Sequence, residues 1–202
     1  MTLIIIIITA LISILAFQKH EIMYKYQFNP YAVKNNKEWV RFFSHAFLHV
    51  DWMHLIFNML VLYFFGRNLE TYFEYYFGAK GILYFILLYV GGIIFAVLPT
   101  YKKHQNDIYY NSVGASGAVS AVLFSGILLD PLNKICLYGI LCFPGIIWAI
   151  IYLGYSIYMG KKGQDNINHD AHLWGALFGV FFTIALRPTF ALEFIDKIIN
   201  YF

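Results

Sequence analysis

The sequence predicts an all-α membrane protein whose helices cross the bilayer several times. Of the 202 residues, 60% are hydrophobic and only 12% are charged, whereas a soluble domain carries about 25% charged residues. The charges are also unevenly placed, because they collect in short polar segments between long stretches that carry none. Since a helix needs about 20 apolar residues to cross the hydrocarbon core, with about 17 as a lower limit, these stretches predict membrane spans.

Six spans are predicted to form one bundle, in a single domain that covers residues 1–202. They lie at residues 2–17, 51–66, 81–98, 113–129, 135–159 and 171–186. The first stretch lacks the basic start and the small-residue cleavage site of a signal peptide, so a transmembrane helix is favoured over that alternative. Several spans have only about 15 to 18 uncharged residues, which is short enough to thin the bilayer locally. The chain shows no inverted repeat of the kind that many transporters have.

The segments between the spans carry turn signals and charges. Residues 18–49 form a long loop in which Asn29-Pro30 marks a turn. The aromatic residues of this loop suit the headgroup region of a bilayer, so we expect interfacial structure there. Pro99 is expected to end the third span, because proline disrupts the interior of a helix.

The composition argues against several other functions. A net charge of +3 with neutral histidines is too small to indicate nucleic-acid binding, and no basic stripe occurs. The two cysteines, Cys136 and Cys142, are expected to be buried as small hydrophobic residues. The nearest approach to the H-E-x-x-H pattern of zinc proteases begins at His20 and ends in Tyr24. The G-x-G-D pattern of intramembrane aspartyl proteases is absent, and a G-x-S-x-G hydrolase motif is excluded by Ala118.

Four polar side chains stand out because they lie in predicted spans, where lipid offers no hydrogen-bond partner. His54 and Asn58 belong to the second span, Ser116 to the start of the fourth and His172 to the sixth. His54 and Asn58 are four residues apart and therefore share one helix face. Each residue has a structural alternative: Ser116 as a small packing residue, His172 as a hydrogen-bonded structural residue, and the other two as partners in interhelical hydrogen bonds.

Ser116 and His172 together indicate a nucleophile and its base. Ser116 falls in the first turn of its span, where backbone N–H groups lack a helical acceptor and the helix dipole is positive. Such a backbone donor is half of an oxyanion hole, and His54 and Asn58 would supply the rest. A neutral imidazole within reach of the serine hydroxyl can take its proton during attack.

A glycine pattern suggests how the two residues meet. Small residues let membrane helices approach closely, and two glycines follow His172 at three and seven positions. The glycine-rich start of the fourth span is the natural counterpart of this smooth face. The surface expected to pack therefore consists of Gly114, Gly117, Gly175 and Gly179.

These residues resemble the rhomboid family of intramembrane serine proteases. Gly114-Ala115-Ser116-Gly117 resembles the GxSG box of that family, and Ala171-His172 with the two following glycines resembles its AHxxGxxxG segment. The second span resembles the histidine-rich stretch of the family that ends in HxxxN, with His45, His49, His54 and Asn58. The segment from Gly66 to Glu70 resembles the GxxxE ending of that helix. The resemblance covers nearly the whole chain.

The resemblance implies a six-helix rhomboid-like bundle that hydrolyses transmembrane segments of other membrane proteins near the membrane surface. Ser116 would be the nucleophile and His172 the base of a dyad without a third acid. The oxyanion hole would comprise His54, Asn58 and the Ser116 N–H group. Glu70 and Arg41 would be structural, with Glu70 tying loops together. The family uses no cofactor or metal, and its partners are substrate proteins and membrane lipid; nothing indicates the oligomeric state.

The chain departs from the family pattern in three places. Some members carry an aromatic residue four positions after the serine, stacked on the histidine, where this chain has Ser120. The adjacent Trp-Arg of the first loop is here Trp39-Val40-Arg41, and Ile167 replaces a glycine before the histidine. An inactive rhomboid-like protein that binds transmembrane helices is one alternative function, and a channel or transporter is another.

The membrane and the orientation follow from the same resemblance. It suggests a multi-pass protein of a bacterial inner membrane with the site facing outward and both termini in the cytoplasm. In that topology the outer loops carry more Lys and Arg residues than the inner loops. This charge distribution is opposite to the positive-inside rule, so charge and family resemblance predict opposite orientations.

Overall fold

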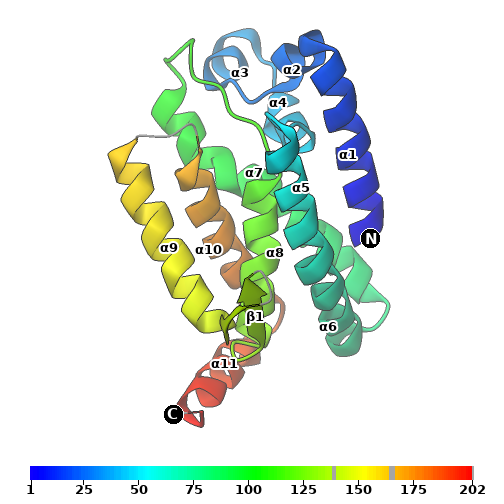
Figure 1. Ribbon diagram of the computed structural model, residues 1–202, viewed down its shortest axis with the longest axis vertical. Coiled ribbons are helices and arrows are strands. Elements are labelled where there is room, and N and C mark those ends of the chain that lie inside the picture. The colour runs from blue at the N-terminus through cyan, green and yellow to red at the C-terminus, as the bar shows by residue number, and fades with distance from the viewer. Residues whose placement is uncertain (138–139, 164–166, 202) are drawn as a thin grey trace.

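Helices make up almost all of the regular structure in the computed structural model, which describes residues 1–137, 140–163 and 167–201. In chain order the elements are α1 (Thr2–Gln18), α2 (His20–Tyr26), α3 (Pro30–Asn36), α4 (Arg41–Ser44), the 3-10 helix η1 (His45–Phe47), α5 (Trp52–Val61), the π-helical η2 (Leu62–Gly66), α6 (Arg67–Phe77), α7 (Lys80–His104), α8 (Ser116–Leu129), β1 (Lys134–Leu137), β2 (Leu141–Pro144), α9 (Gly145–Lys162), α10 (His169–Leu186) and α11 (Thr189–Ile199). The predicted helical class is therefore confirmed, with one small hairpin added (Figure 1).

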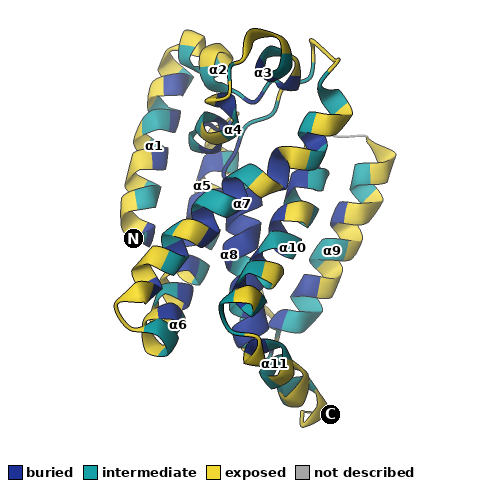
Figure 2. Ribbon diagram, turned by 180° about the vertical axis from the view of Figure 1, so that it is seen from behind, coloured by how far each residue is buried: buried dark blue, intermediate teal, exposed yellow. Residues whose placement is uncertain are grey.

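Helix α8 forms the centre of the bundle. Eleven of its fourteen residues are buried, and Figure 2 shows it surrounded by the other long helices. Helices α7 and α10 lie directly against it, and Gly92 of α7 packs on Ala118 and Ala121 of α8. Helix α1 lies at one edge of the bundle beside α5, and α9 lies at the other (Figure 1). The start of α8, where Ser116 is the first residue, is thus enclosed by several elements.

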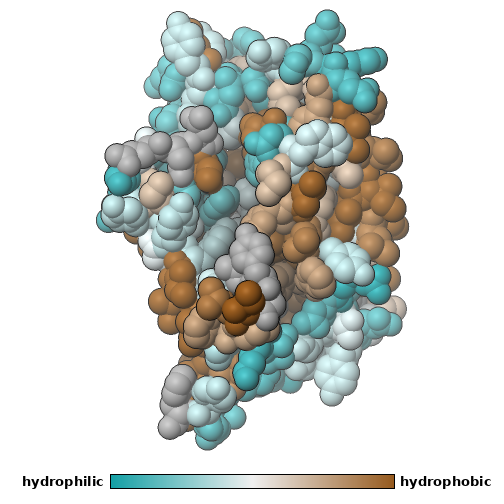
Figure 3. All heavy atoms as spheres, viewed as in Figure 1, coloured by the Kyte–Doolittle hydropathy of each residue, from teal (hydrophilic) through white to brown (hydrophobic). Residues whose placement is uncertain are grey.

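Large hydrophobic side chains cover much of the outer surface, as a lipid environment requires. On α1, Ile7 and Leu11 are more than half exposed. Figure 3 shows hydrophobic residues over the middle of the face formed by α1 and α5, with hydrophilic residues above and below them. This arrangement is the reverse of a soluble surface and matches a protein whose midsection contacts lipid.

The number of spans is not established by helix length and composition. Among the described residues, α7 and α10 are long and apolar enough to cross a membrane. The α1–α2 pair, bent by 118°, and the run from α4 through α6, bent by 95°, would raise this number to four if each is one span. Helix α8 is apolar but has only 14 residues. The predicted total of six is therefore not confirmed.

Two helices run further than predicted. Helix α5 continues through η2 into α6, so the helical run passes Gly66 and ends at Phe77. Gly66 serves as a contact point there, since a Cβ at this position would lie 2.7 Å from Oγ1 of Thr2 on α1. Helix α7 continues through Pro99 to His104. Membrane helices tolerate such a proline because neighbouring groups satisfy the backbone that it frees.

The polar segments contain more helix than we predicted from the sequence. Residues 18–49 hold α2, α3, α4 and η1. Helix α3 starts after Asn29, whose side chain accepts a hydrogen bond from the Ala32 N–H group at 2.7 Å. Helix α11 follows α10 and was not predicted. Helix α8 begins at Ser116, slightly later than the predicted start at residue 113.

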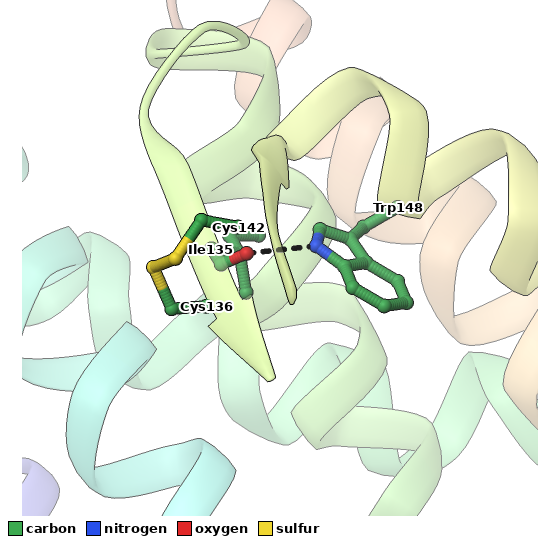
Figure 4. The surroundings of a disulfide bond; sticks show 4 residues. All are labelled: Ile135, Cys136, Cys142 and Trp148. Atoms are coloured by element: carbon green, nitrogen blue, oxygen red, sulfur yellow. Dashed lines mark hydrogen bonds between the residues drawn. A yellow bond between two sulfur atoms is a disulfide. The ribbon is translucent and has the colours of Figure 1, made fainter. Parts of the chain in front are cut away.

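The predicted fifth span is wrong at its start. Residues 134–137 and 141–144 pair as the antiparallel strands β1 and β2, and α9 begins only at Gly145. Pro144 gives the physical reason, because proline is disfavoured inside a helix and favoured at its beginning. The indole N–H of Trp148 donates to the Ile135 carbonyl at 2.8 Å and ties the hairpin to α9 (Figure 4).

The prediction for the two cysteines is also wrong. Cys136 and Cys142 are exposed and form a disulfide across the hairpin (Figure 4). They face each other in the register of β1 and β2. This pairing could not be predicted while the segment was expected to be a helix, because two residues that are six positions apart do not lie on the same face of a helix.

Candidate active site

Ser116 is the first residue of α8, and local geometry leaves its backbone available. Ala115 is the N-cap and makes no side-chain cap bond. The N–H groups of the first helical residues therefore lack an intrahelical acceptor and point toward the side from which α8 begins. Gly114 has φ of +125°, a conformation that side chains rarely adopt, and it lets the chain turn sharply into the helix.

Residues 112–115, which precede Ser116, are held by hydrogen bonds to the segment 18–49. The Gly114 N–H group donates to the His45 carbonyl at 3.0 Å. The Ala115 N–H group points at Nε2 of His49 at 3.5 Å. Further along, Ser112 and Phe28 exchange two backbone hydrogen bonds of 3.0 and 2.9 Å.

His49 connects this segment to α1. Its Nδ1 atom lies 2.9 Å from Oγ of Ser13, and that hydroxyl contacts the Phe47 carbonyl at 2.8 Å. One tautomer satisfies every group: Nδ1–H donates to Ser13, Ser13 donates to Phe47, and Nε2 accepts from Ala115. Helix α1, the segment 18–49 and the residues that precede Ser116 are therefore joined through one fully buried histidine.

His172 lies in the first turn of α10, whose start is anchored on α7. The Asn168 side chain caps the helix by accepting from the Ala171 N–H group at 3.0 Å, and it also accepts from the Thr100 hydroxyl at 3.1 Å. Lys103 and Asp170 form an ion pair of 3.1 Å beside it.

Helices α8 and α10 touch through their backbones. A Cβ added to Gly175 would lie 2.1 Å from the Gly117 carbonyl oxygen, and one added to Gly179 would lie 2.2 Å from the Ala121 carbonyl oxygen. The Ala171 carbonyl also lies 3.5 Å from a Cβ built on Gly117. Gly117 follows Ser116 and Ala171 precedes His172, so the contact between these two neighbours shows that the first turns of the two helices lie side by side.

The other expected packing glycine has a different role. Gly114 lies outside α8, and a Cβ there would be 2.8 and 2.9 Å from Cε1 and Nε2 of His54. The ring of His54 therefore occupies the space beside Gly114, two residues before Ser116. It also lies 4.8 Å from the ring of His49. Asn58 donates one amide hydrogen to the His54 carbonyl at 2.9 Å, within its own helix, and the other N–H of the amide is left for a further acceptor.

Arg41 and Glu70 both make structural contacts. Nearly buried Arg41 donates to the Glu38 carboxylate at 2.5 Å and to the carbonyls of Tyr24 and Gln27 at 3.0 and 2.7 Å, which joins α2 to α4. Hydrogen bonds from Asn36 and then from Arg41 lower the pKa of Glu38. Glu70 accepts from a backbone N–H at the start of α1 at 2.7 Å, so its partner is a helix end, whereas we expected a loop.

Tyr152 of α9 is a site residue that we did not predict from the sequence. Its ring is stacked on the His172 imidazole, with 5.9 Å between centroids and 24° between planes. Its hydroxyl lies 2.6 Å from Oγ of Ser120. No pattern singles out this residue among the aromatic residues of α9. The one available signal is the small side chain of Ser120, which leaves space beside the histidine.

A small cavity of about 20 Å³ adjoins Ser116 and has room for roughly one water molecule. It is lined in part by Ser112, Asn168 and Ala171. Among the described residues, no group of three or more His, Cys, Asp or Glu side chains lies close enough to hold a metal ion.

Comparison with known proteins identifies the family. The sequence model of the rhomboid domain matches residues 36–189. RHOMBOID-like protein 12, mitochondrial, of Arabidopsis thaliana is 31% identical over 146 residues, which cover 65% of this chain and 41% of that protein. Putative rhomboid protease YdcA of Bacillus subtilis is 29% identical over 152 residues, covering 71% and 65%. Rhomboid protein 1, mitochondrial, of Saccharomyces cerevisiae is 32% identical over 144 residues, covering 68% and 39%.

These relatives also bear on length and compartment. The chain spans less than two thirds of the length of each of them. They include mitochondrial proteins of a plant and a yeast, so the expectation of a bacterial inner membrane is not supported. The domain match over residues 36–189, together with the apolar helices, shows that this chain is an integral membrane protein of the rhomboid family, whose members are in general intramembrane serine proteases.

Proposed function

We propose that this chain is an intramembrane serine endopeptidase that cleaves transmembrane segments of other membrane proteins near the membrane surface. The observation that carries the proposal is the backbone contact between Gly117 and Gly175, which sets the first turns of α8 and α10 side by side. Ser116 immediately precedes the first of these glycines, and His172 lies one turn before the second. The proposed nucleophile and base therefore come from the two helices in closest contact.

The acylation step uses the dyad and the donors around it. The His172 imidazole takes the proton of the Ser116 hydroxyl while Oγ attacks the scissile carbonyl carbon. The oxyanion that forms accepts hydrogen bonds from the Ser116 N–H group and from His54 and Asn58. His172 then gives its proton to the leaving amine nitrogen, the C–N bond breaks, and the acyl group remains on Ser116.

Deacylation reverses these roles with water as the nucleophile. The water oxygen attacks the acyl carbon while His172 takes a proton from the water. His172 then returns the proton to Oγ of Ser116 as the carboxylic acid leaves. The small cavity beside Ser116 has room for about one water molecule and is lined by Ala171, the neighbour of His172, but not by His172 itself. Because the proposed mechanism uses a dyad without a third acid, it requires other contacts to orient the imidazole.

The substrate class follows from the location of the site. Ser116 starts α8 next to the first loop, at the end of the central helix and not at its middle. A transmembrane helix hides its carbonyls in its own hydrogen bonds, so a substrate must unwind locally before attack. We therefore expect small or helix-breaking residues at the cleaved bond.

The test compares the parent with Ser116→Ala and His172→Ala in detergent and in liposomes, using a generic single-span substrate. The parent should cleave it and react with a fluorophosphonate at Ser116, and both variants should lose cleavage. Chelators should have no effect. Cleavage that survives Ser116→Ala, or that chelators abolish, would overturn the proposal. A parent that binds the substrate but neither cleaves it nor reacts with the probe would instead identify an inactive rhomboid-like protein.

A further inference from the structure

The ring of Tyr152, on α9, is stacked on the His172 imidazole. Its hydroxyl also approaches α8, at 2.6 Å from Oγ of Ser120. One side chain from α9 thus contacts the helix of the proposed base and the helix of the proposed nucleophile.

The direction of the hydrogen bonds can be assigned from the number of protons. Ser120 carries one hydroxyl proton, and it donates this proton to the Ser116 carbonyl at 2.8 Å. Oγ of Ser120 can then only accept from Tyr152, so the tyrosine hydroxyl is the donor. The chain of bonds runs from Tyr152 through Ser120 to the backbone of Ser116.

The size of Ser120 makes this arrangement possible. Ser120 is buried and lies one helical turn after Ser116. A larger side chain at position 120 would occupy the space beside the imidazole, and the short serine leaves it to a ring from α9. Phe124, one turn further along α8, also contacts Tyr152, and the centroids of their rings are 5.6 Å apart.

We propose that Tyr152 is the positioning residue for His172, holding the imidazole by stacking while its hydroxyl is fixed through Ser120 to the Ser116 backbone. The inference rests on the proposed function, because it assigns His172 the role of base. Since α9 is an edge helix in which only Gly145, Ala149 and Ser156 are buried, the orientation of the base depends on how closely α9 packs on α10.

The variants separate the ring from the hydroxyl. Tyr152→Phe keeps the ring and should retain kcat within about tenfold, whereas Tyr152→Ala should lower kcat by roughly 10²-fold with little change in KM. The double change Ser120→Tyr with Tyr152→Ala supplies a ring from α8 and should recover at least about tenfold of that loss. Tyr158→Ala is the matched control, because that tyrosine is on the same helix but 60% exposed.

A spectroscopic readout makes the test independent of turnover. In protein labelled with 13C at histidine Cε1, the signal of His172 is identified because it disappears in His172→Gln. The chemical shift of this signal should change in Tyr152→Ala but not in Tyr152→Phe or Tyr158→Ala. The pH profile of kcat/KM should move with it. The proposal is overturned if the His172 signal and kcat of folded Tyr152→Ala match the parent, or if kcat falls while the signal stays. If the signal moves but no variant, nor the parent, cleaves substrate, the proposed function fails, and the stacking remains without a catalytic role.

Discussion

The contact between Gly175 and α8 allows a direct test of the active-site geometry. A Cβ at position 175 would lie 2.1 Å from the Gly117 carbonyl oxygen, while real Cβ contacts essentially never fall below 3.0 Å. The contacted atoms belong to the backbone of a buried helix and cannot rotate away. Gly175→Ala therefore requires α10 to move by about 0.9 Å relative to α8.

The size of the effect follows from this displacement. A misplacement of about 1 Å can lower a catalytic rate roughly 10²-fold, which corresponds to about 2.7 kcal/mol of activation free energy. Overpacking of a tight interface separately costs about 1–3 kcal/mol of unfolding free energy. We expect Gly175→Ala to lower kcat by roughly two orders of magnitude and to lower Tm in detergent, and Gly175→Val to do more of both.

The matched control is Gly154→Ala in α9. Nothing lies within 4 Å of a Cβ built there, so the change adds a methyl group in a helix without a collision. Turnover of a single-span substrate and thermal unfolding should be measured on both variants in the same detergent. If Gly175→Ala cleaves as fast as Gly154→Ala and unfolds at the same temperature, the argument that this contact sets the distance between Ser116 and His172 is wrong.

Four further sets of experiments test separate parts of the molecule. His54→Ala and Asn58→Ala should each slow turnover by up to roughly 10²–10³-fold without unfolding the protein, and an undiminished rate in the double variant would refute their role as oxyanion donors. Arg41→Ala should lower Tm, because hydrogen bonds to a charged group are worth about 1.5–3 kcal/mol each, and an unchanged melting curve would contradict this. Thr183→Val removes the buried hydroxyl contact of 2.6 Å between α10 and α8 and should cost about 0.6–1.7 kcal/mol of stability while leaving kcat close to that of the parent. Reduction should add the mass of two hydrogen atoms to the intact chain, and Cys136→Ser should abolish that change.

The parts of the structure that follow from local patterns could be predicted from the sequence. Apolar stretches locate α1, α8 and α10 to within three residues, because each is a helix over most of its uncharged length. The glycine spacing after His172 indicates a close helix contact, and the structure places Gly175 and Gly179 against the α8 backbone. Both inferences need only the periodicity of a helix and the size of glycine.

The parts that depend on tertiary contacts could not be predicted in this way. Strands β1 and β2 contain apolar residues that suit a span equally well, and only Pro144 indicates where α9 starts. Helix α7 passes Pro99 because neighbouring helices support it, which a local rule cannot detect. Tyr152 meets His172 only after α9 has packed on α10, and no spacing along the chain relates the two residues.

Tertiary contacts, and not local sequence patterns, also determine the position of the proposed site. Because lipid is as apolar as the surface of a helix, burial of apolar side chains contributes little to the association of membrane helices. Between α8 and α10 that role falls to backbone contacts at glycine and to the Ser125–Thr183 hydroxyl pair, which is fully buried. Backbone contacts fix a distance more rigidly than long side chains do, since no rotamer can absorb a change. The proposed base on the first turn of α10 also lies beside the rings of Tyr152 and His169, and of these two we propose that Tyr152 orients its imidazole.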